Sequence, residues 1–325
     1  MNTKIIDLMQ APSEQRDLDW LKESLQAAVE LEFATVPVYL CGMWSIEVQS
    51  GPVFSSIRSV VIDEMFHMAL ACNLLTSIGG TPEINTEGAL PKYPGHLPGG
   101  VRPSLTVALA GLTKQVVEKM YMEIEFPEHG PVAMFLGQPF PTIGDFYDAI
   151  LDEFRKLSAS DITGARQISR GTKLFAINTL VDAEKAIDRI KRQGEGTDRL
   201  QSPFSDDAGT VLAHYYQFAQ IFHERKLIKA ADGKFKFEGD AVPFPNVFPM
   251  AQVPAAGYPE SHDFNLHFTT MLNQLQVAWQ NGDPDELDNA IDTMRTDLTD
   301  AARALIATPL PSGEGNFGPS FQLAS

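Results

Sequence analysis

The chain has 325 residues, which is enough for one large or two ordinary domains with a sizeable hydrophobic core. Its 25 lysines and arginines stand against 42 aspartates and glutamates, and the formal charge of -17 disfavours non-specific binding to nucleic acid or to an anionic membrane. Residues 1–20 contain no apolar run of signal-peptide length, and no later run suggests a membrane span, so we expect a cytoplasmic protein.

The first predicted helix covers about residues 17–49 and carries a carboxylate on its apolar side. Asp17 is a suitable N-cap for it. Glu32 falls within the apolar stripe of this helix, whereas Glu30 shares a face with polar residues. Pro37 removes a backbone donor and is expected to kink the helix next to Glu32. Glu32 is therefore the interior candidate.

The second predicted helix, about residues 53–78, contains the most informative pair in the chain. Glu64 and His67 form a Glu-x-x-His step, and both fall in an apolar stripe with steps of three and four residues. A buried carboxylate and imidazole are costly without a partner, so a metal ion or a hydrogen-bonded network is expected. The spacing also fits a solvated helix pair, but in helical bundles with two iron or manganese ions this step supplies one carboxylate and one imidazole.

Two long segments join the predicted helices. Residues 81–103 are rich in proline and glycine and are expected to cross a long distance without regular structure, as the crossovers of helical bundles do. Residues 128–172 are also punctuated by proline and glycine and contain a helix near 143–157. We interpret this second segment as an insertion that covers the bundle.

The third predicted helix covers about residues 113–126 and holds three glutamates. Glu125 aligns with the apolar residues of this helix, whereas Glu118 and Glu123 lie nearer its polar face. Pro127 is expected to end the helix. Glu125 is therefore the interior candidate.

The fourth helical region is predicted as two pieces, about 183–191 and 207–228, separated by a polar loop that contains Glu195. In the second piece His214 shares a side with apolar residues, while His223 lies among charged residues nearer to solvent. Two more helices, about 264–280 and 285–307, are expected to form a C-terminal extension. An Asn-Gly-Asp-Pro turn separates the two helices.

These candidates form one ligand set. Carboxylates bridge and neutralise two cations while imidazoles complete each position, so the set predicts a dimetal site. Such ligands suit two iron ions, and manganese or a mixed pair is also allowed. A structural zinc is disfavoured because Cys41 and Cys72, which we expect to be buried thiols, lack the required spacing. The sequence also lacks a serine nucleophile elbow and a phosphate-binding loop. The predicted ligands are Glu32, Glu64, His67, Glu125, Glu195 and His214.

Characteristic motifs are spread over nearly the whole chain, at residues 28–40, 63–67, 73–80, 93–98, 124–127, 143–147, 193–196, 214–218 and 318–321. With these motifs the chain resembles the ferritin-like domain proteins related to VioB, the iminophenyl-pyruvate dimer synthase-like family connected with violacein biosynthesis. The resemblance supports the same six ligand positions. The namesake also has an oxidative domain that this chain lacks, so its coupling of indole imines is not expected here.

The resemblance implies an all-α fold, a ferritin-like four-helix bundle with a long crossover, an inserted cover region and extra C-terminal helices. It implies one elaborated domain over residues 1–325, with the bundle core at about 17–228 and a helical extension at about 260–310. The sequence departs from an ordinary dimetal bundle at one point. Glu195 and His214 are separated by eighteen residues rather than forming a second Glu-x-x-His step.

The leading functional hypothesis is a non-haem diiron oxidase or oxygenase that uses dioxygen on a small, amino-acid-derived organic substrate of a secondary-metabolic pathway. Tyr121 or Tyr215 is expected to donate a proton or a hydrogen bond near the metals. Two alternatives stay open, namely a ferroxidase or iron-binding module without an organic substrate, and a metal-free helical interaction protein. The sequence leaves the oligomeric state open, a homo-oligomer included.

Overall fold

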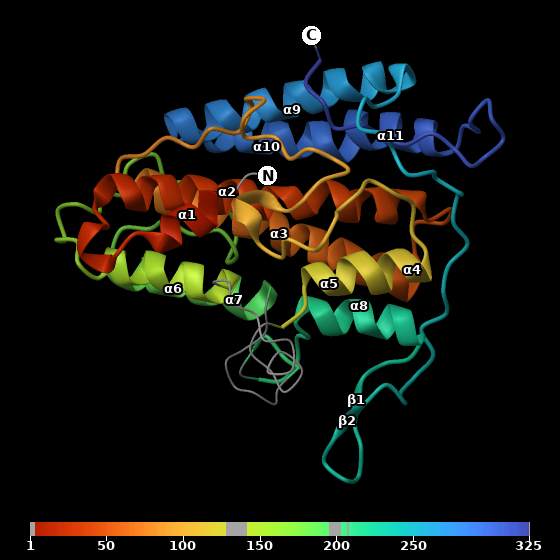
Figure 1. Ribbon diagram of the computed structural model, residues 1–325, viewed down its shortest axis with the longest axis horizontal. Helices are drawn as coiled ribbons and strands as arrows, with labels where there is room; N and C mark the ends of the chain where they lie inside the picture. Colours follow the sequence, from red (N-terminus) through yellow and green to blue (C-terminus); the bar gives the residue numbers. More distant parts are fainter. Residues whose placement is uncertain (1–3, 128–141, 195–202, 207, 325) are drawn as a thin grey trace.

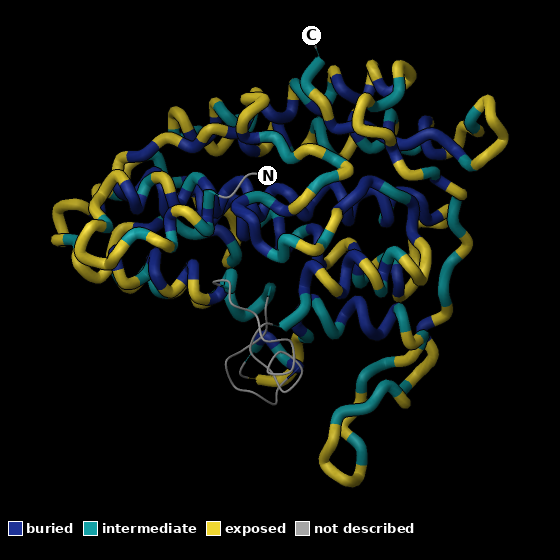
Figure 2. The backbone as a smooth tube through the Cα atoms, viewed as in Figure 1, coloured by how far each residue is buried: buried dark blue, intermediate teal, exposed yellow. Residues whose placement is uncertain are grey.

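A computed structural model describes residues 4–127, 142–194, 203–206 and 208–324. Within these ranges the chain is mostly helical, as predicted, and its long helices lie in three layers (Figure 1). The middle layer holds α2 (Leu18–Ser45) and α3 (Gly51–Ser77), which pack along each other. Figure 2 shows that buried residues are concentrated along these two helices. They form the centre of the hydrophobic core.

The α2 helix begins and ends where its backbone groups find side-chain partners. Asp17 is the N-cap, as predicted, and its carboxylate accepts a hydrogen bond from the Trp20 amide. The helix continues through Pro37 and ends at Ser45, four residues earlier than predicted. The Arg303 guanidinium donates to the carbonyl oxygens of Trp44 and Glu47 at 2.6 and 2.9 Å, and so satisfies acceptors at this end.

The α3 helix ends before two glycines, as predicted. Gly79 follows it with a positive φ of 78°, a conformation that glycine adopts without a steric penalty. Contrary to the sequence interpretation, α3 is long and apolar enough to span a membrane. However, 78% of its most apolar window is buried inside the protein, as expected for a core helix.

One outer layer consists of two short helical pairs placed end to end (Figure 1). The first pair is α6 (Ile143–Phe154) and α7 (Leu180–Gly194), which contact α2 and α3 respectively. The second pair is the α4–α5 helix and α8 (His214–His223), which also contacts α3. The α4–α5 helix comprises α4 (Lys114–Val116), the π-helical segment η3 (Val117–Tyr121) and α5 (Met122–Ile124).

The opposite layer is the predicted C-terminal extension, made of α9 (His262–Asn281), α10 (Pro284–Thr293), the π-helical segment η6 (Met294–Leu298) and α11 (Thr299–Ile306). In this layer α9 packs on α3 and α11 packs on α2, while α10 packs on α9. Trp279 donates its indole N–H to the side chain of the buried Asn73 at 3.0 Å, which attaches α9 to α3. The apolar residues of this layer belong to the same buried cluster as those of the bundle.

The connections agree with the sequence in part. Residues 81–103 contain only a short 3-10 turn, η2 (Pro98–Gly100), so the predicted crossover is confirmed, and α1 (Lys4–Gln10) packs against it. The predicted helix over 207–228 is too long. Its chain leaves α8 at Glu224 with a φ of 53° and continues into a hairpin of β1 (Ile228–Lys229) and β2 (Phe235–Lys236). Cys41 and Cys72 are buried free thiols, as expected.

Candidate metal centre

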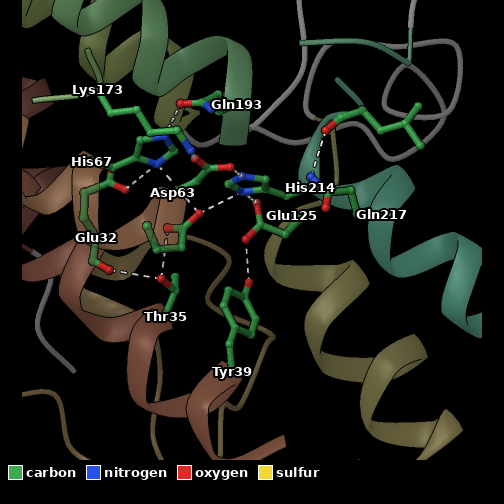
Figure 3. Close-up of polar contacts among 12 residues, drawn as sticks. Glu32, Thr35, Tyr39, Asp63, His67, Glu125, Lys173, Gln193, His214 and Gln217 are labelled. Atoms are coloured by element: carbon green, nitrogen blue, oxygen red, sulfur yellow. Dashed lines mark hydrogen bonds and ion pairs between the residues drawn. The ribbon is translucent and has the colours of Figure 1, made fainter. Parts of the chain in front are cut away.

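Five of the six predicted ligands come together between the middle layer and the short helices that face it (Figure 3). None of the five is more than 6% exposed. The α2 helix supplies Glu32, and α3 supplies Glu64 and His67 one turn apart. Glu125 is the residue directly after α5, and His214 is the first residue of α8. The sixth candidate, Glu195, lies outside the described residues.

The five side chains form two groups that share Glu64. One group is Glu32, Glu64 and His67, and the other is Glu64, Glu125 and His214. Within each group one ligand atom per residue lies within 4.8 Å of the others. A carboxylate shared by two groups has the position of a bridge between two cations.

The two histidines point the same ring nitrogen at the carboxylates. His67 Nδ1 lies 3.5 Å from Glu32 Oε2 and 3.7 Å from Glu64 Oε1. His214 Nδ1 lies 2.8 Å from Glu64 Oε1 and 3.5 Å from Glu125 Oε2. The two rings are stacked at a centroid distance of 5.7 Å. This places one imidazole in each group of three ligands.

The other ring nitrogens face oxygen atoms outside the ligand set. His67 Nε2 lies 3.1 Å from Gln193 Oε1, and His214 Nε2 lies 3.7 Å from Asp63 Oδ2. Metal-binding histidines usually donate their second N–H to such an oxygen, which fixes the tautomer and the ring orientation. In a metal-bound centre this arrangement would leave Nδ1 of each histidine for a cation.

Unsatisfied buried atoms agree with a cation at this place. Glu64 Oε1 and both ring nitrogens of His214 are buried, and within the described residues they make no well-directed hydrogen bond. Glu64 Oε1 and His214 Nδ1 lie 2.8 Å apart, but their geometry is not that of a hydrogen bond. Buried polar atoms without partners are rare in proteins, and an ion satisfies them. The residues present therefore fit a metal centre.

The electrostatics of the metal-free cluster favour bound protons. Burial, together with the neighbouring Glu125 charge, raises the pKa of Glu64. Burial opposes protonation of His67, but the carboxylates of Glu32 and Glu64 outweigh this effect and raise its pKa. Burial acts in the same way on His214, yet Glu125 and Asp63 raise its pKa well above the ordinary value. Cations would replace these protons, as binding of metals to histidine requires.

Three hydroxyl groups hold the carboxylates in place. Tyr39 Oη donates to Glu125 Oε1 at 2.5 Å, and Thr35 Oγ1 donates to Glu64 Oε2 at 3.0 Å. Tyr147, from the inserted helix α6, donates a short hydrogen bond to Glu32. Burial, reinforced by the charges of Glu125 and Glu64, raises the pKa of Tyr39 well above its usual range, so this tyrosine stays a donor.

The two tyrosines expected to act near the metals make other contacts among the described residues. Tyr121 is fully buried, and its hydroxyl donates to the carbonyl oxygen of Val38 at 3.0 Å. Tyr215 is half-buried, and its ring packs edge-on against Phe126. The tyrosine hydroxyls that bond ligand carboxylates within the described residues are those of Tyr39 and Tyr147. The sequence carried a signal for Tyr39, which lies seven residues after Glu32 and therefore on the same face of α2.

The π-helical segment η3 lies one short helix, α5, before Glu125 in the chain. Such segments insert an extra residue into a helical turn and are frequent at functional sites. The segment packs closely on α2, because a Cβ atom at Gly42 would collide with the hydroxyl group of Tyr121. The predicted choice of Glu125 as the interior glutamate of this helix is confirmed, since Glu118 is half-buried and Glu123 is exposed.

Asp63 is a part of the cluster that the sequence analysis missed. It is 3% exposed, and Lys173 Nζ lies 2.6 Å from its Oδ1 atom. Burial alone would raise the pKa of Asp63, but His214 and Lys173 lower it to about 2, so the carboxylate stays ionised beside His214. The one sequence signal for Asp63 was its position next to Glu64 in a helix that was expected to be buried.

Glu30 and His223, the alternatives to Glu32 and His214 as ligands, lie outside the two ligand groups. Glu30 is buried, contrary to the expectation for a polar face, because it accepts hydrogen bonds from Lys4 and Gln26 at 3.3 and 3.1 Å. His223 is exposed, as predicted, and stacks on the ring of Phe237.

A cavity of about 50 Å³ adjoins the cluster on one side. It reaches four of the five ligand residues, namely Glu32, Glu64, His67 and Glu125. A small molecule in this space would lie directly beside the carboxylates. The arrangement can therefore place a reactant next to a metal pair.

Two of three comparisons with known proteins find a match, and the third finds none. A sequence model of the family named Ferritin-like matches residues 25–223. The solved structure of a ferritin-like protein from Caulobacter vibrioides is similar, with a TM-score of 0.63 and 19% sequence identity, and the match covers 93% of this chain and 97% of that one. No curated protein matches the sequence. At this level of identity the structural match shows a shared fold.

Proposed function

The chain belongs to the ferritin-like family, and on that premise we propose that it is a non-haem dimetal-carboxylate oxidoreductase that uses dioxygen on a small organic substrate. Its metal ligands would be Glu32, Glu64, His67, Glu125 and His214, with Glu195 as a sixth. Two iron ions are the proposed cofactor, although manganese or a mixed pair would suit the same oxygen and imidazole donors. The proposed site of action is the cytoplasm.

The observation that supports this proposal most strongly is the sharing of Glu64 by two ligand groups with one imidazole each. A structural metal would need only one closed group. Two groups joined by a carboxylate, with a cavity beside them, are the arrangement expected for redox chemistry on a bound molecule.

Two iron ions held there would supply the electrons that reduce dioxygen. The protein itself would position the ligand side chains and exclude water. Thr35, Tyr39 and Tyr147 donate to one oxygen of Glu64, Glu125 and Glu32 respectively, which leaves the second oxygen of each carboxylate for a cation. Asp63 and Gln193 orient the imidazoles. The aliphatic walls of the cavity exclude water and hold the organic substrate.

The test is metal analysis followed by oxygen uptake. Protein loaded with ferrous iron under anaerobic conditions should hold two ions per chain, one for each ligand group. It should then consume dioxygen faster when its organic substrate is present. The variant in which Glu64 and His67 are both alanine should lose iron and oxygen uptake, while Glu123→Ala, at an exposed position of α5, should retain both.

Three outcomes would count against the proposal in different ways. Protein that takes up no iron would exclude a metal centre. Iron oxidation that turns over at full rate without any organic molecule would identify a ferroxidase instead. Metal content that is unchanged in the Glu64 and His67 double variant would remove the proposed ligands from the site.

A further inference from the structure

The cavity beside the cluster does not treat the two ligand groups equally. Glu32, Glu64 and His67, the complete first group, all line it, whereas His214 of the second group does not. The second group is enclosed instead by Tyr39, which bonds Glu125, and by Asp63, which faces His214. Room for a reactant therefore exists at the His67 group.

The walls of this cavity are aliphatic. Apart from the ligand His67, Tyr147 is the one aromatic residue among the described residues that line it, and its hydroxyl donates to Glu32. Branched aliphatic side chains favour contact with an alkyl group, because both surfaces leave water. The aliphatic wall residues are Leu31, Leu97, Ile124, Ile143 and Ile190.

The size of the cavity limits what the walls can hold. Its volume is about 50 Å³, whereas an engineered cavity that binds benzene measures about 150 Å³. A chain of a few carbon atoms fits such a space, but an aromatic ring requires the walls to move. The cavity is thus suited to aliphatic rather than to aromatic or indole-derived substrates.

One cationic side chain lies at this cavity outside the ligand set. Among the described lining residues Lys191 is the one lysine or arginine. Its Nζ atom lies 2.5 Å from Asp148 Oδ1, and its side chain is 21% exposed. An ammonium group has three N–H donors and Asp148 accepts one, so Lys191 also has donors for an anion.

We propose that the cavity binds a small aliphatic carboxylate, with its alkyl part against the leucine and isoleucine walls and its carboxylate at Lys191. The inference rests on the proposed function, because it defines the substrate class of the same site. A small molecule derived from an aliphatic amino acid has both features, a short alkyl chain and a carboxylate.

Calorimetric titration of zinc-loaded protein tests this assignment without any turnover, since zinc has no redox chemistry. Butyrate should bind, while butan-1-ol and phenylacetate should each bind about tenfold more weakly, the first for lack of charge and the second for its size. Ile143→Ala should enlarge the cavity and raise the affinity for phenylacetate.

Two variants of the Lys191–Asp148 pair and one control variant test whether Lys191 or the metal binds the anion. Lys191→Met should weaken butyrate about tenfold and leave butan-1-ol unchanged. Asp148→Asn removes the competing carboxylate and should strengthen butyrate binding. Lys185→Met, which alters a lysine of the same helix that lies over the ring of Phe175, should change neither ligand.

Equal affinity for butyrate in wild-type protein and Lys191→Met would overturn the assignment of Lys191. Phenylacetate binding as tightly as butyrate would overturn the aliphatic class. Metal content is measured on the same samples, so protein that holds two metal ions but binds no butyrate refutes this inference alone. Protein that holds no metal refutes the proposed function.

Discussion

The α2–α3 pair and the layer of short helices that faces it build the two sides of the cluster in different ways. The pair is continuous and deeply buried, and it holds Glu32, Glu64 and His67 within the turns of two long helices. The facing layer contributes residues at helix ends: Glu125 follows α5, and His214 begins α8. The first side is fixed by the core, whereas the second depends on where short helices begin and end.

Removal of Glu64 should have the largest effect on metal content, because Glu64 belongs to both ligand groups. Glu64→Ala should reduce the iron content from two ions per chain to nearly none, since both ligand groups lose a carboxylate. Glu32→Ala and Glu125→Ala should each retain about one ion, because each belongs to one group. Elemental analysis of anaerobically loaded protein measures this, and equal losses in all three variants would contradict two separable positions.

Lower pH should empty both metal positions. Burial opposes protonation of His67 and His214, but the surrounding carboxylates outweigh it and raise the pKa of both imidazoles. Metal must displace these protons, and uptake therefore falls as pH decreases. Stepwise dialysis of cobalt-loaded protein followed by visible spectroscopy measures the loss. Cobalt content that stays constant as the pH falls from about 8 to about 5 would contradict protonation of these ligands.

Removal of the residues that orient the imidazoles should have a smaller effect. Asp63→Asn keeps the shape but removes the charge near His214 Nε2, and it should weaken one metal position about 10–100-fold. Gln193→Leu should likewise weaken the metal position of His67, because Gln193 contacts His67 Nε2. Competition with a chelator measures both affinities, and Asp188→Asn, at an exposed position of α7, is the control. An unchanged affinity in both variants would remove these residues from the site.

The tyrosine hydroxyls should give the smallest effects. Tyr39→Phe and Tyr147→Phe each remove one hydrogen bond to a ligand carboxylate, so each should weaken its metal position about tenfold. Tyr216→Phe should have no effect, because its ring packs on Tyr215 away from the ligands. The same chelator competition measures this, and a loss in Tyr216→Phe equal to that in Tyr39→Phe would show an effect of folding alone.

The same comparison explains which parts of the site could be predicted. The periodicity of two long helices was sufficient to place Glu32, Glu64 and His67 on buried faces, because a continuous helix keeps its phase. Tyr147 and Gln193 come from segments whose position against α2 and α3 depends on tertiary packing, and no local pattern links them to Glu32 or His67.

The limits of the short helices were also difficult to predict. The helix predicted over 207–228 is reduced to α8, because the chain turns at Glu224 with a positive φ and the preceding residues pair with one another as a loop. Asp63 was missed because a carboxylate next to Glu64 lies off the apolar stripe, and its burial depends on Lys173 from a distant loop.

Mössbauer spectroscopy of protein loaded with isotopically enriched iron and then oxidised tests the central claim most directly. Two iron ions per chain should appear as a magnetically coupled pair, because Glu64 is shared by both ligand groups, and the coupling should be absent in Glu64→Ala. A single iron per chain, or two ferric ions without magnetic coupling, would contradict a centre bridged by Glu64.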